Sequence, residues 1–357
     1  MGLSSVHQFL PALHDGDAIG FEALSLKRFF LSQGIESKIY AYTVDPSLAS
    51  EAEPLTSYRD REDVKIYHFA IPSPLTDFFL TAKGKKVLIH HNITPSHFFT
   101  RFRKDLFRIG HYGRKELKYL KTVTALAVGD SEYNRRELEE AGFLKTAVFP
   151  LMVDYSRYVS REPVAVLKEL FRDGRFNLLT VGRVVANKRV EDVIKIFFYY
   201  KKFIDNDARL FVVGNCRSDE KYYHALLDYV NFFFLSSKDV IFTGHLPEEE
   251  LLSYYGLADL FITMSEHEGF CLPLVESMIY DLPIVAYDST AISGTLGGAG
   301  MRVKTKDPAR VGELLSLLRQ NDSLRKGLIH GQQARVKEIR NLSDPGRFLS
   351  LLEETLS

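Results

Sequence analysis

The chain has 357 residues, and its 46 lysines and arginines are balanced by 46 aspartates and glutamates. A formal charge of zero argues against a dedicated nucleic-acid-binding protein, which would normally be basic. The two cysteines, Cys216 and Cys271, exclude a disulfide framework and a cysteine-rich zinc site, and no apolar run reaches the ~18 residues of a membrane-spanning helix. Without the pattern of a signal peptide, the expected compartment is the cytoplasm.

Short apolar runs alternate with segments of helical periodicity along the first 150 residues. The runs predicted as strands are 6–10, 37–42, 64–69, 86–91, 125–128 and 147–150. Apolar residues at helical spacing predict helices over 18–32 and 131–141. This alternation is typical of parallel sheets built from βαβ units.

A second series of the same kind follows a stretch of mixed polarity at 150–175. The strands predicted there are 177–181, 209–213, 240–243, 260–263 and 284–287, with helices over 190–203 and 221–234. The length predicts about two domains, and the two series predict two doubly wound α/β domains. Ligands bind at the carboxyl ends of the strands in such sheets, so a cleft between two facing sheets is the expected site.

The stretch 265–276 follows a predicted strand and carries two carboxylates. Pro273 suits the first turn of a helix, which places Glu268 in the preceding loop and Glu276 about one turn inside the helix. Free backbone N–H groups at this helix start would bind an anion; they belong to Gly269, Phe270, Cys271 and Leu272. Carboxylates on either side of a phosphate site suit sugar hydroxyls. A capping loop with two unrelated glutamates is the simpler alternative.

Two cations, Arg183 and Lys188, lie five residues apart after the predicted strand 177–181. Fixed cations stabilise negative charge that develops on an anionic group, and arginine can bind phosphate in a bidentate manner. The alternative is a solvated loop with ordinary surface charges.

Two further features of the first domain bear on a site. The stretch 16–20, Gly-Asp-Ala-Ile-Gly, opens the first long helix, and glycine there allows a close approach of the backbone to a ligand, although a plain tight turn explains it nearly as well. His90 and His91 end a predicted strand, where adjacent side chains point to opposite faces and cannot readily share a metal ion. One of them should face the cleft, unless it is a buried structural histidine.

Taken together, these segments resemble the retaining glycosyltransferase family four, the glycosyl transferases group 1, which has the GT-B fold. Residues 265–276 are similar to its E-x7-E motif, residues 181–194 to its V-G-R-x4-K segment, and residues 88–95 to its strand-end histidine segment. In this chain Arg189 stands where many relatives have glycine, and Asn92 where many have aspartate.

The resemblance implies an α/β protein with two facing Rossmann-like domains and a central cleft. Residues 1–155 would bind the acceptor, residues 156–343 would bind the nucleotide sugar, and a final amphipathic helix in 344–357 would cross back to the first domain. The predicted catalytic residues are His91, Arg183, Lys188 and Glu268. The predicted donor-binding residues are Gly16, Asp17, Gly182, Arg183, Lys188, Gly244, Leu246, Gly269, Phe270, Cys271, Leu272 and Glu276.

The implied function is retaining transfer of a hexose from a GDP- or UDP-sugar to a glycan or glycolipid acceptor, in the assembly of a cell-surface polysaccharide or lipopolysaccharide. No metal or other cofactor is expected, and no nucleic acid partner. Two alternatives share the fold: a nucleotide-sugar epimerase, and a non-catalytic partner subunit. The latter should have lost the charged site residues, which are all present here.

The segment 97–121 is strongly basic. It contains eight lysines and arginines against one aspartate and one glutamate, interleaved with six phenylalanines and tyrosines. Basic amphipathic helices with aromatic residues bind anionic membrane surfaces, so we expect peripheral attachment to the inner face of the cell membrane. The residues predicted to carry it are Arg101, Arg103, Lys104 and Arg108. The alternative is a helix whose aromatic side chains pack inward.

Overall fold

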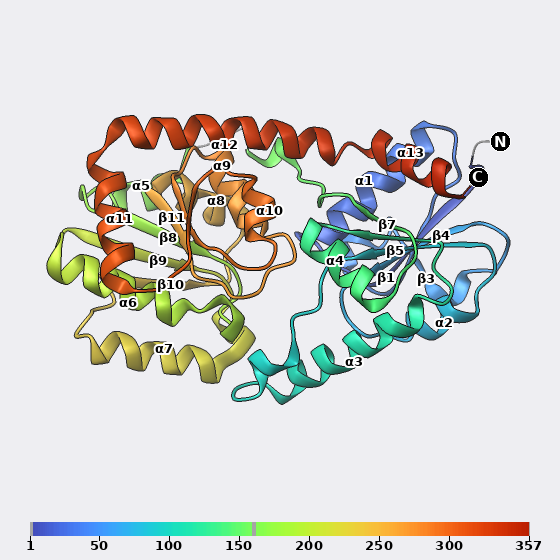
Figure 1. The fold of residues 1–357 in the computed structure, drawn as a ribbon, viewed down its shortest axis with the longest axis horizontal. Helices are drawn as coiled ribbons and strands as arrows, with labels where there is room; N and C mark the ends of the chain where they lie inside the picture. The colour runs from blue at the N-terminus through green and yellow to red at the C-terminus, as the bar shows by residue number, and fades with distance from the viewer. Residues whose placement is uncertain (1–2, 159–161, 357) are drawn as a thin grey trace. The chain divides into compact units, whose positions relative to one another are not determined.

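The computed structural model describes residues 3–158 and 162–356, which form two compact units (Figure 1). Unit 1 contains the described residues of Met1–His97, Asp105–Asp154 and Glu338–Ser357, and unit 2 contains those of Phe98–Lys104 and Tyr155–Lys337. The chain returns to unit 1 within helix α12 (Asp322–Leu342). None of the described helices combines the length and the apolar character needed to cross a bilayer.

In the described part of unit 1, seven parallel strands form one sheet in the order β3-β2-β1-β4-β5-β6-β7. The strands are β1 (Val6–Leu13), β2 (Ile39–Val44), β3 (Glu53–Pro54), β4 (Val64–Phe69), β5 (Lys85–His90), β6 (Leu126–Gly129) and β7 (Thr146–Val148). The helices are α1 (Ala18–Ser32), α2 (Leu75–Thr81), α3 (Lys104–Leu120), α4 (Glu132–Ala141) and α13 (Pro345–Leu356), with 3-10 turns η1 (Pro46–Leu48), η2 (Leu55–Ser57) and η3 (Ser96–Phe99). The strand order reverses between β1 and β4, which is where doubly wound sheets open a crevice for ligands.

Strand β4 lies at the centre of this sheet, and all six of its residues are buried. A strand covered by helices on both faces is expected to be apolar throughout rather than alternating. Polar residues that interrupt such a strand, as Lys65 and His68 do here, therefore need partners inside the unit. Lys65 finds Asp63, with 2.6 Å between Nζ and Oδ1.

Helix α13 is part of the core of unit 1. Phe348 and Leu352 are fully buried in the cluster that contains Val6 and Leu26, and the rings of Phe348 and Phe149 lie 4.8 Å apart. Truncating a buried phenylalanine to alanine typically costs ~3–5 kcal/mol. The last helix therefore stabilises unit 1.

Six parallel strands form the sheet of unit 2 within its described residues, in the order β10-β9-β8-β11-β12-β13. The strands are β8 (Phe176–Val181), β9 (Ala208–Val213), β10 (Val240–Gly244), β11 (Leu260–Thr263), β12 (Ile284–Tyr287) and β13 (Met301–Val303). The helices, besides α12, are α5 (Ala165–Leu170), α6 (Val190–Phe203), α7 (Glu220–Phe232), α8 (Glu248–Leu257), α9 (Leu272–Ile279), α10 (Ile292–Leu296) and α11 (Pro308–Gln320), with 3-10 turns η4 (Tyr155–Tyr158), η5 (Ala186–Lys188) and η6 (Cys216–Asp219).

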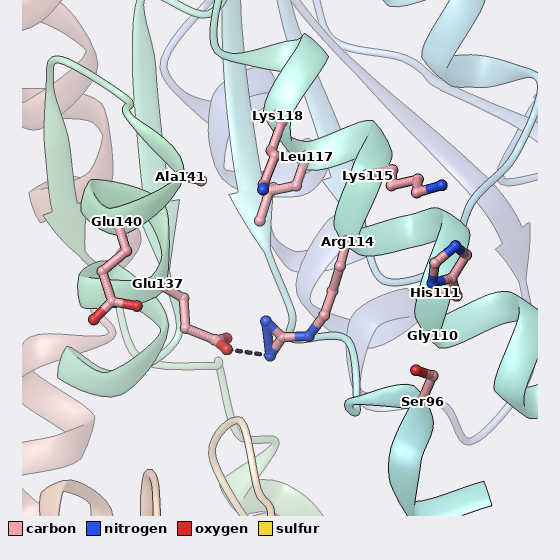
Figure 2. A pocket seen from close by; sticks show the side chains of 10 residues that line it. All are labelled: Ser96, Gly110, His111, Arg114, Lys115, Leu117, Lys118, Glu137, Glu140 and Ala141. Carbon is pink, nitrogen blue, oxygen red and sulfur yellow. Dashed lines mark hydrogen bonds and ion pairs between the residues drawn. The ribbon is translucent and has the colours of Figure 1, made fainter. Parts of the chain in front are cut away.

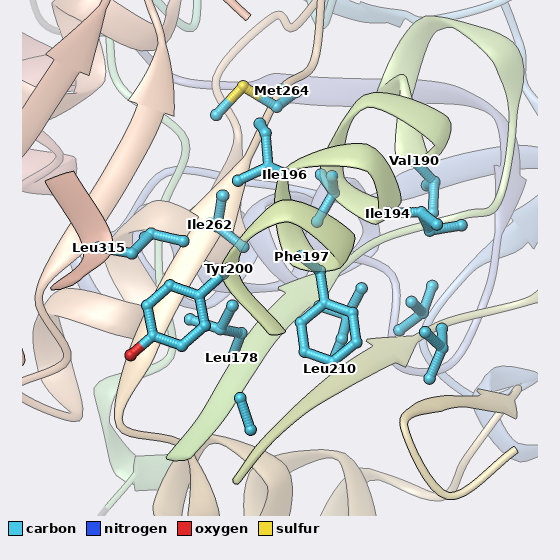
Figure 3. Packing of buried hydrophobic residues seen from close by; sticks show 14 of the residues in the cluster. Leu178, Val190, Ile194, Ile196, Phe197, Tyr200, Leu210, Ile262, Met264 and Leu315 are labelled. Atoms are coloured by element: carbon cyan, nitrogen blue, oxygen red, sulfur yellow. The ribbon is translucent and has the colours of Figure 1, made fainter. Parts of the chain in front are cut away.

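Helix α6 shows how the core of unit 2 forms. Its buried residues recur at helical spacing, so one apolar stripe faces the sheet. Figure 3 shows Phe197 and Tyr200 of this helix packed with Leu178 and Leu210 of the sheet. The helix follows Arg189, whose φ of 54° lies in the left-handed region. A glycine would adopt this conformation without the strain that a Cβ imposes.

Candidate functional site

The strand order of unit 2 reverses between β8 and β11, which are hydrogen-bonded neighbours. The loop after β8 carries Arg183 and Lys188, and the loop after β11 carries Glu268. Both loops leave the carboxyl edge of the sheet at the switch point, where ligands of doubly wound sheets bind. Two segments that the sequence separates by about eighty residues are thus brought to one place.

The two loops are joined by an ion pair. The Nζ atom of Lys188 lies 2.6 Å and 2.7 Å from the two carboxylate oxygens of Glu268. The Glu268 side chain is only 8% exposed, whereas that of Lys188 is 22% exposed. Arg183 is exposed, and no ion pair involves it in the described part of the chain. Its charge is therefore available to an anion, while that of Lys188 is balanced.

Asn187 holds the same two loops together. Its Nδ2 donates to the carbonyl of His267 at 3.0 Å, and its own carbonyl accepts from the backbone N–H of Glu266 at 2.9 Å and from the Ser265 hydroxyl at 3.1 Å. The side chain is buried. Asn187 was not predicted as a site residue, and its place between Arg183 and Lys188 was the only signal.

Three glycines end neighbouring strands at this edge. Gly182 has a φ of 144°, and a Cβ on Gly214 would lie 2.0 Å from the carbonyl oxygen of Gly182. Gly214 in turn forms an isolated bridge with Gly244, two residues before the half-buried Leu246. Only glycine permits so close an approach, so this part of the edge presents backbone rather than side chains. Gly214 was missed by sequence reasoning.

Helix α9 begins at the same edge. Cys271 precedes it with a φ of 69°, and Pro273 lies in its first turn, as predicted. Residues 269–272 lie at or directly before this helix start, where backbone N–H groups favour an anion. Burial raises the pKa of the Cys271 thiol well above its usual value, so the thiol stays protonated and does not supply a nucleophile.

Glu276 lies inside α9 and is buried. Its Oε1 accepts from the Tyr158 hydroxyl at 2.9 Å, and its Oε2 accepts from the Tyr255 hydroxyl at 2.6 Å. Burial raises the pKa of this carboxyl group, although the two tyrosine hydrogen bonds oppose the shift. A nucleotide ribose would have to share these oxygens with the tyrosines or displace one of them.

The second group of polar side chains lies in unit 1, near the reversal between β1 and β4. His91 follows β5, His68 lies in β4, Glu22 lies in α1 and Asp130 follows β6. His91 Nε2 is 3.0 Å from His68 Nδ1, and His91 Nδ1 is 3.0 Å from Asp130 Oδ2. Glu22 Oε2 lies 3.8 Å from His91 Nε2, and all four side chains are at most 4% exposed.

The hydrogen bonds assign the protons of this network. Gln8 Nε2 donates to the carbonyl of Ala23 at 2.8 Å, so its Oε1 accepts from His68 Nε2 at 2.9 Å. Burial lowers the pKa of His68 well below its usual value, so His68 carries one proton and its Nδ1 accepts from His91 Nε2. Because His91 Nδ1 donates to Asp130, both nitrogens of His91 carry protons. His91 is therefore an imidazolium.

The charges around His91 agree with this assignment. Burial disfavours the cation, but Asp130 and Glu22 more than compensate and raise the pKa of His91 to about 9. Burial raises the pKa of Glu22 to about 8, against the opposing effect of His91. Both ring nitrogens of His91 are engaged within unit 1, and contact between this side chain and a sugar hydroxyl remains a prediction.

Glu22, His68 and His91 could together hold a metal ion, since one ligand atom from each lies within 4.8 Å of the others. The proton that His91 donates to His68 occupies this space in the arrangement described above. A metal would require its removal. His90, the other histidine of the pair, faces a different partner: its Nε2 lies 3.5 Å from Glu137 Oε2.

The other residues predicted in the first half of the chain are two donor-binding residues and four membrane-binding residues. Gly16, with a φ of 73°, and Asp17 connect β1 to α1 in unit 1, and the charge of Asp17 contributes to the raised pKa of His91. The four predicted membrane residues are divided between the units, because Arg101, Arg103 and Lys104 belong to unit 2 and Arg108 to unit 1. Arg103 is half-buried, and the other three are exposed.

Comparison with known proteins matches residues 166–335 to the family described as Glycosyl transferases group 1. This segment contains the loops of Arg183, Lys188 and Glu268 and the helix of Glu276. Residues 166–335 belong to the glycosyl transferases group 1. The prediction of this family from the sequence motifs is confirmed.

Curated relatives of this group 1 segment include two mannosyltransferases. The O-antigen chain mannosyltransferase B of Escherichia coli is 31% identical over 85 residues, which are 24% of this chain and 22% of that protein. The MMP alpha-(1->4)-mannosyltransferase of Mycolicibacterium hassiacum is 35% identical over 115 residues, 32% of this chain and 25% of that protein. The chain thus spans about a quarter or less of the length of these two relatives.

Solved structures match both units of the chain. Anabaena HepE in complex with UDP-glucose has a TM-score of 0.75 at 14% identity and covers 98% of this chain and 99% of its own. An alpha,alpha-trehalose-phosphate synthase from Burkholderia vietnamiensis has a TM-score of 0.76 at 12% identity, with 99% of both chains covered. Two parallel-sheet α/β domains of the GT-B fold are therefore confirmed for this chain.

Proposed function

We propose that this chain is a retaining glycosyltransferase that moves a hexose from a nucleotide diphosphate sugar to a glycan or lipid-linked acceptor in cell-surface polysaccharide assembly. The observation that carries the proposal is the meeting of Arg183, Lys188 and Glu268 at the switch point of unit 2, within the segment that matches the group 1 family. The names of the curated mannosyltransferases support hexose transfer.

In the proposed reaction, Arg183 and Lys188 bind the donor diphosphate and stabilise the charge that develops on it. The bond from the sugar C1 to the diphosphate oxygen breaks, and a bond from C1 to the acceptor oxygen forms on the same face. The acceptor hydroxyl proton passes to the departing diphosphate. Backbone groups near Gly244 and Leu246 contact the base, and Glu276 accepts hydrogen bonds from the ribose. No metal takes part in this proposal.

A lipid-linked acceptor would bring the enzyme to a membrane surface. Within unit 1, the exposed residues Arg108, Tyr112, Lys115 and Tyr119 of α3 are spaced by four, three and four positions, so they share one face. Cations and tyrosines on one helical face suit anionic head groups and the bilayer interface. We propose peripheral attachment through this helix and the basic residues that precede it.

Thermal unfolding with UDP, GDP and their hexose derivatives tests the donor site. A ligand at about 100 times its Kd should stabilise the protein by ~2.7 kcal/mol. Analysis of the anomeric configuration of the product then tests retention. Stabilisation with turnover in the absence of an acceptor would favour an epimerase, and binding without any turnover would favour a non-catalytic subunit. A protein that binds no nucleotide or nucleotide sugar would contradict the proposal.

A further inference from the structure

A pocket of about 430 Å³ lies between α3 and α4 in unit 1 (Figure 2). Arg114, Lys115 and Lys118 of α3 and Glu137 and Glu140 of α4 are among the residues that line it. Its volume falls within the roughly 300–1,000 Å³ of small-molecule sites. None of the predicted donor or catalytic residues lines it, so it is a site that the motifs did not indicate.

The carboxylate of Glu137, which is 9% exposed, is neutralised from within the protein. It forms an ion pair with Arg114, which Figure 2 shows as a dashed line. It also accepts from Asn92 Nδ2 at 3.0 Å and from the Tyr133 hydroxyl at 3.3 Å, and His90 Nε2 lies 3.5 Å away. Such a carboxylate has little remaining capacity to bind a cation. The pocket is therefore not an acidic site.

Three basic side chains of α3 have hydrogen-bond donors that are not fully used within the protein. The buried Nε of Arg114 has no hydrogen-bond acceptor among the residues that the structure describes, although a buried donor without a partner costs about 1–3 kcal/mol. Lys115 and Lys118 are exposed and form no ion pair with any described residue, although Lys115 Nζ lies 5.8 Å from the centre of the Tyr112 ring. The exposed Glu140 also lines the pocket and, among the described residues, is the one carboxylate there besides Glu137. The balance favours a ligand with several acceptor oxygens and negative charge.

The fold holds this wall in place. A Cβ on Gly110 would lie 2.6 Å from the carbonyl oxygen of Thr94, and one on Gly113 would lie 2.6 Å from Ile93 Cδ1. The two glycines thus let α3 pack directly on the turn that follows His91 and Asn92. Asn92 has a φ of 77° and donates to Asn134 and Glu137 of α4. The pocket and the His91 segment are therefore parts of one rigid arrangement.

We propose that the pocket binds the phosphate group of a phosphorylated acceptor, with the ammonium groups of Lys115 and Lys118 donating to its oxygens. The inference rests on the proposed glycosyl transfer, because only a transferase needs an acceptor site in addition to its donor site. The same phosphate chemistry is offered by a lipid head group and by a soluble phosphorylated sugar, and the experiment separates these two sources.

The test compares two variants of α3 that remove equal charge. Lys115→Ser with Lys118→Ser empties the pocket of its free ammonium groups, and Lys104→Ser with Arg108→Ser removes two cations outside it. Binding of sn-glycerol 3-phosphate is measured by calorimetry, with glycerol as the uncharged control. All measurements are repeated in an Arg183→Ala background, so that binding at the donor site is recognised. Binding to vesicles of phosphatidylglycerol in phosphatidylcholine is measured in parallel.

The pocket variant should lose about tenfold or more in affinity for glycerol 3-phosphate, as expected for two charged hydrogen-bond donors, while the matched variant should bind like the wild type. Vesicle binding that is weakened more by the pocket variant, without binding of the soluble probe, would identify a lipid head group as the source. No binding of either probe to the wild type, or equal losses of glycerol 3-phosphate affinity in both variants, would overturn the proposal. Failure of the proposed function would show separately, as absence of nucleotide-sugar binding.

Discussion

Lys188 and Glu268 form an ion pair across 80 residues of chain, with Nζ to carboxylate distances of 2.6 Å and 2.7 Å. The residue before Lys188, Asn187, joins the same two loops, because its side chain donates to the carbonyl of His267, next to Glu268. The pair therefore fixes the geometry of both loops before any ligand arrives. A diphosphate must compete with Glu268 for Lys188, whereas Arg183 can bind it directly.

This difference predicts distinct effects for the two cations. Arg183→Ala should lower kcat by ~10²-fold or more, because charge on the leaving group develops mainly in the transition state, without lowering the melting temperature. Lys188→Ala should lower kcat similarly and also destabilise unit 2 by about 1–3 kcal/mol, because it leaves the Glu268 carboxylate unpaired. Steady-state kinetics and calorimetry measure both. Equal stability losses in the two variants would contradict the assignment.

The two tyrosines at Glu276 allow its role to be tested. Glu276→Ala should weaken UDP or GDP binding by ~1.5–3 kcal/mol through loss of a charged acceptor, and it should destabilise unit 2 because two buried hydroxyls lose their partner. Tyr158→Phe keeps the carboxylate and frees one oxygen, so nucleotide affinity should be retained or increased. Titration calorimetry of both variants is the measurement, and Tyr255→Phe, which frees the other oxygen of Glu276, should behave like Tyr158→Phe. Wild-type affinity in Glu276→Ala would refute the ribose contact.

The protonated His91 network predicts a pH dependence of stability. The pKa of His91 is raised to about 9 and that of Glu22 to about 8. Both groups therefore hold protons more tightly in the folded state, and their stabilisation is lost as the pH rises towards these values. The pKa of His68 is lowered, so it acts in the opposite sense, below about pH 6.5. Asp17 and Asp130 also face His91.

Unit 1 should therefore lose up to about 1.4 kcal/mol per pH unit for each titrating group, from pH 7 to about 8 for Glu22 and to about 9 for His91. Asp130→Asn removes a charge that favours the imidazolium, so this variant should be less stable at pH 7 and should show a flatter profile above it. Differential scanning calorimetry across this range, with Asp77→Asn as an exposed control in the same unit, makes the comparison. A wild-type transition that is independent of pH would disprove the imidazolium.

Metal-independent transfer predicts that activity survives EDTA. The site proposed for the diphosphate uses Arg183 and Lys188 as its cations. At Glu22, His68 and His91, the proton between His91 and His68 occupies the space that a metal ion would need. Activity measured with and without EDTA, together with elemental analysis of the purified protein, provides the check. Complete loss in EDTA that Mn²⁺ or Mg²⁺ restores would refute the mechanism, and stoichiometric bound zinc would refute the proton assignment.

Peripheral attachment predicts salt-sensitive binding to anionic vesicles. Each cation near the surface contributes ~1 kcal/mol, screened over a Debye length of about 8 Å at physiological ionic strength. Replacing Arg101, Arg103, Lys104 and Arg108 with serine should abolish the binding. Affinity for the soluble nucleotide sugar should remain, because Arg183 and Lys188 are untouched. Vesicle co-sedimentation at two salt concentrations measures the effect, and a wild-type protein that ignores anionic vesicles at low salt would favour a soluble acceptor.

Local patterns in the sequence were sufficient to predict much of the secondary structure and the family. Helix α6 was predicted with the bounds that the structure gives it, Val190–Phe203, because its apolar stripe follows the helical period without interruption. The short spacing between Arg183 and Lys188, and between Glu268 and Glu276, likewise places their motifs within single loops or helix starts. Strand ends were less accurate, as with β2, where the expected 37–42 became Ile39–Val44.

Contacts between distant segments depended on the tertiary structure. His68, Glu22 and Asp130 meet His91 because the strand order of unit 1 places β4 and β5 side by side and brings α1 over their ends. Periodicity shows which residues form strands, but it does not specify which strands become neighbours. The same reason hid Asn187 and Gly214, whose roles depend on loops that approach from other strands. It also hid the pocket between α3 and α4, because Glu137 is neutralised only where the two helices meet and Arg114 reaches it.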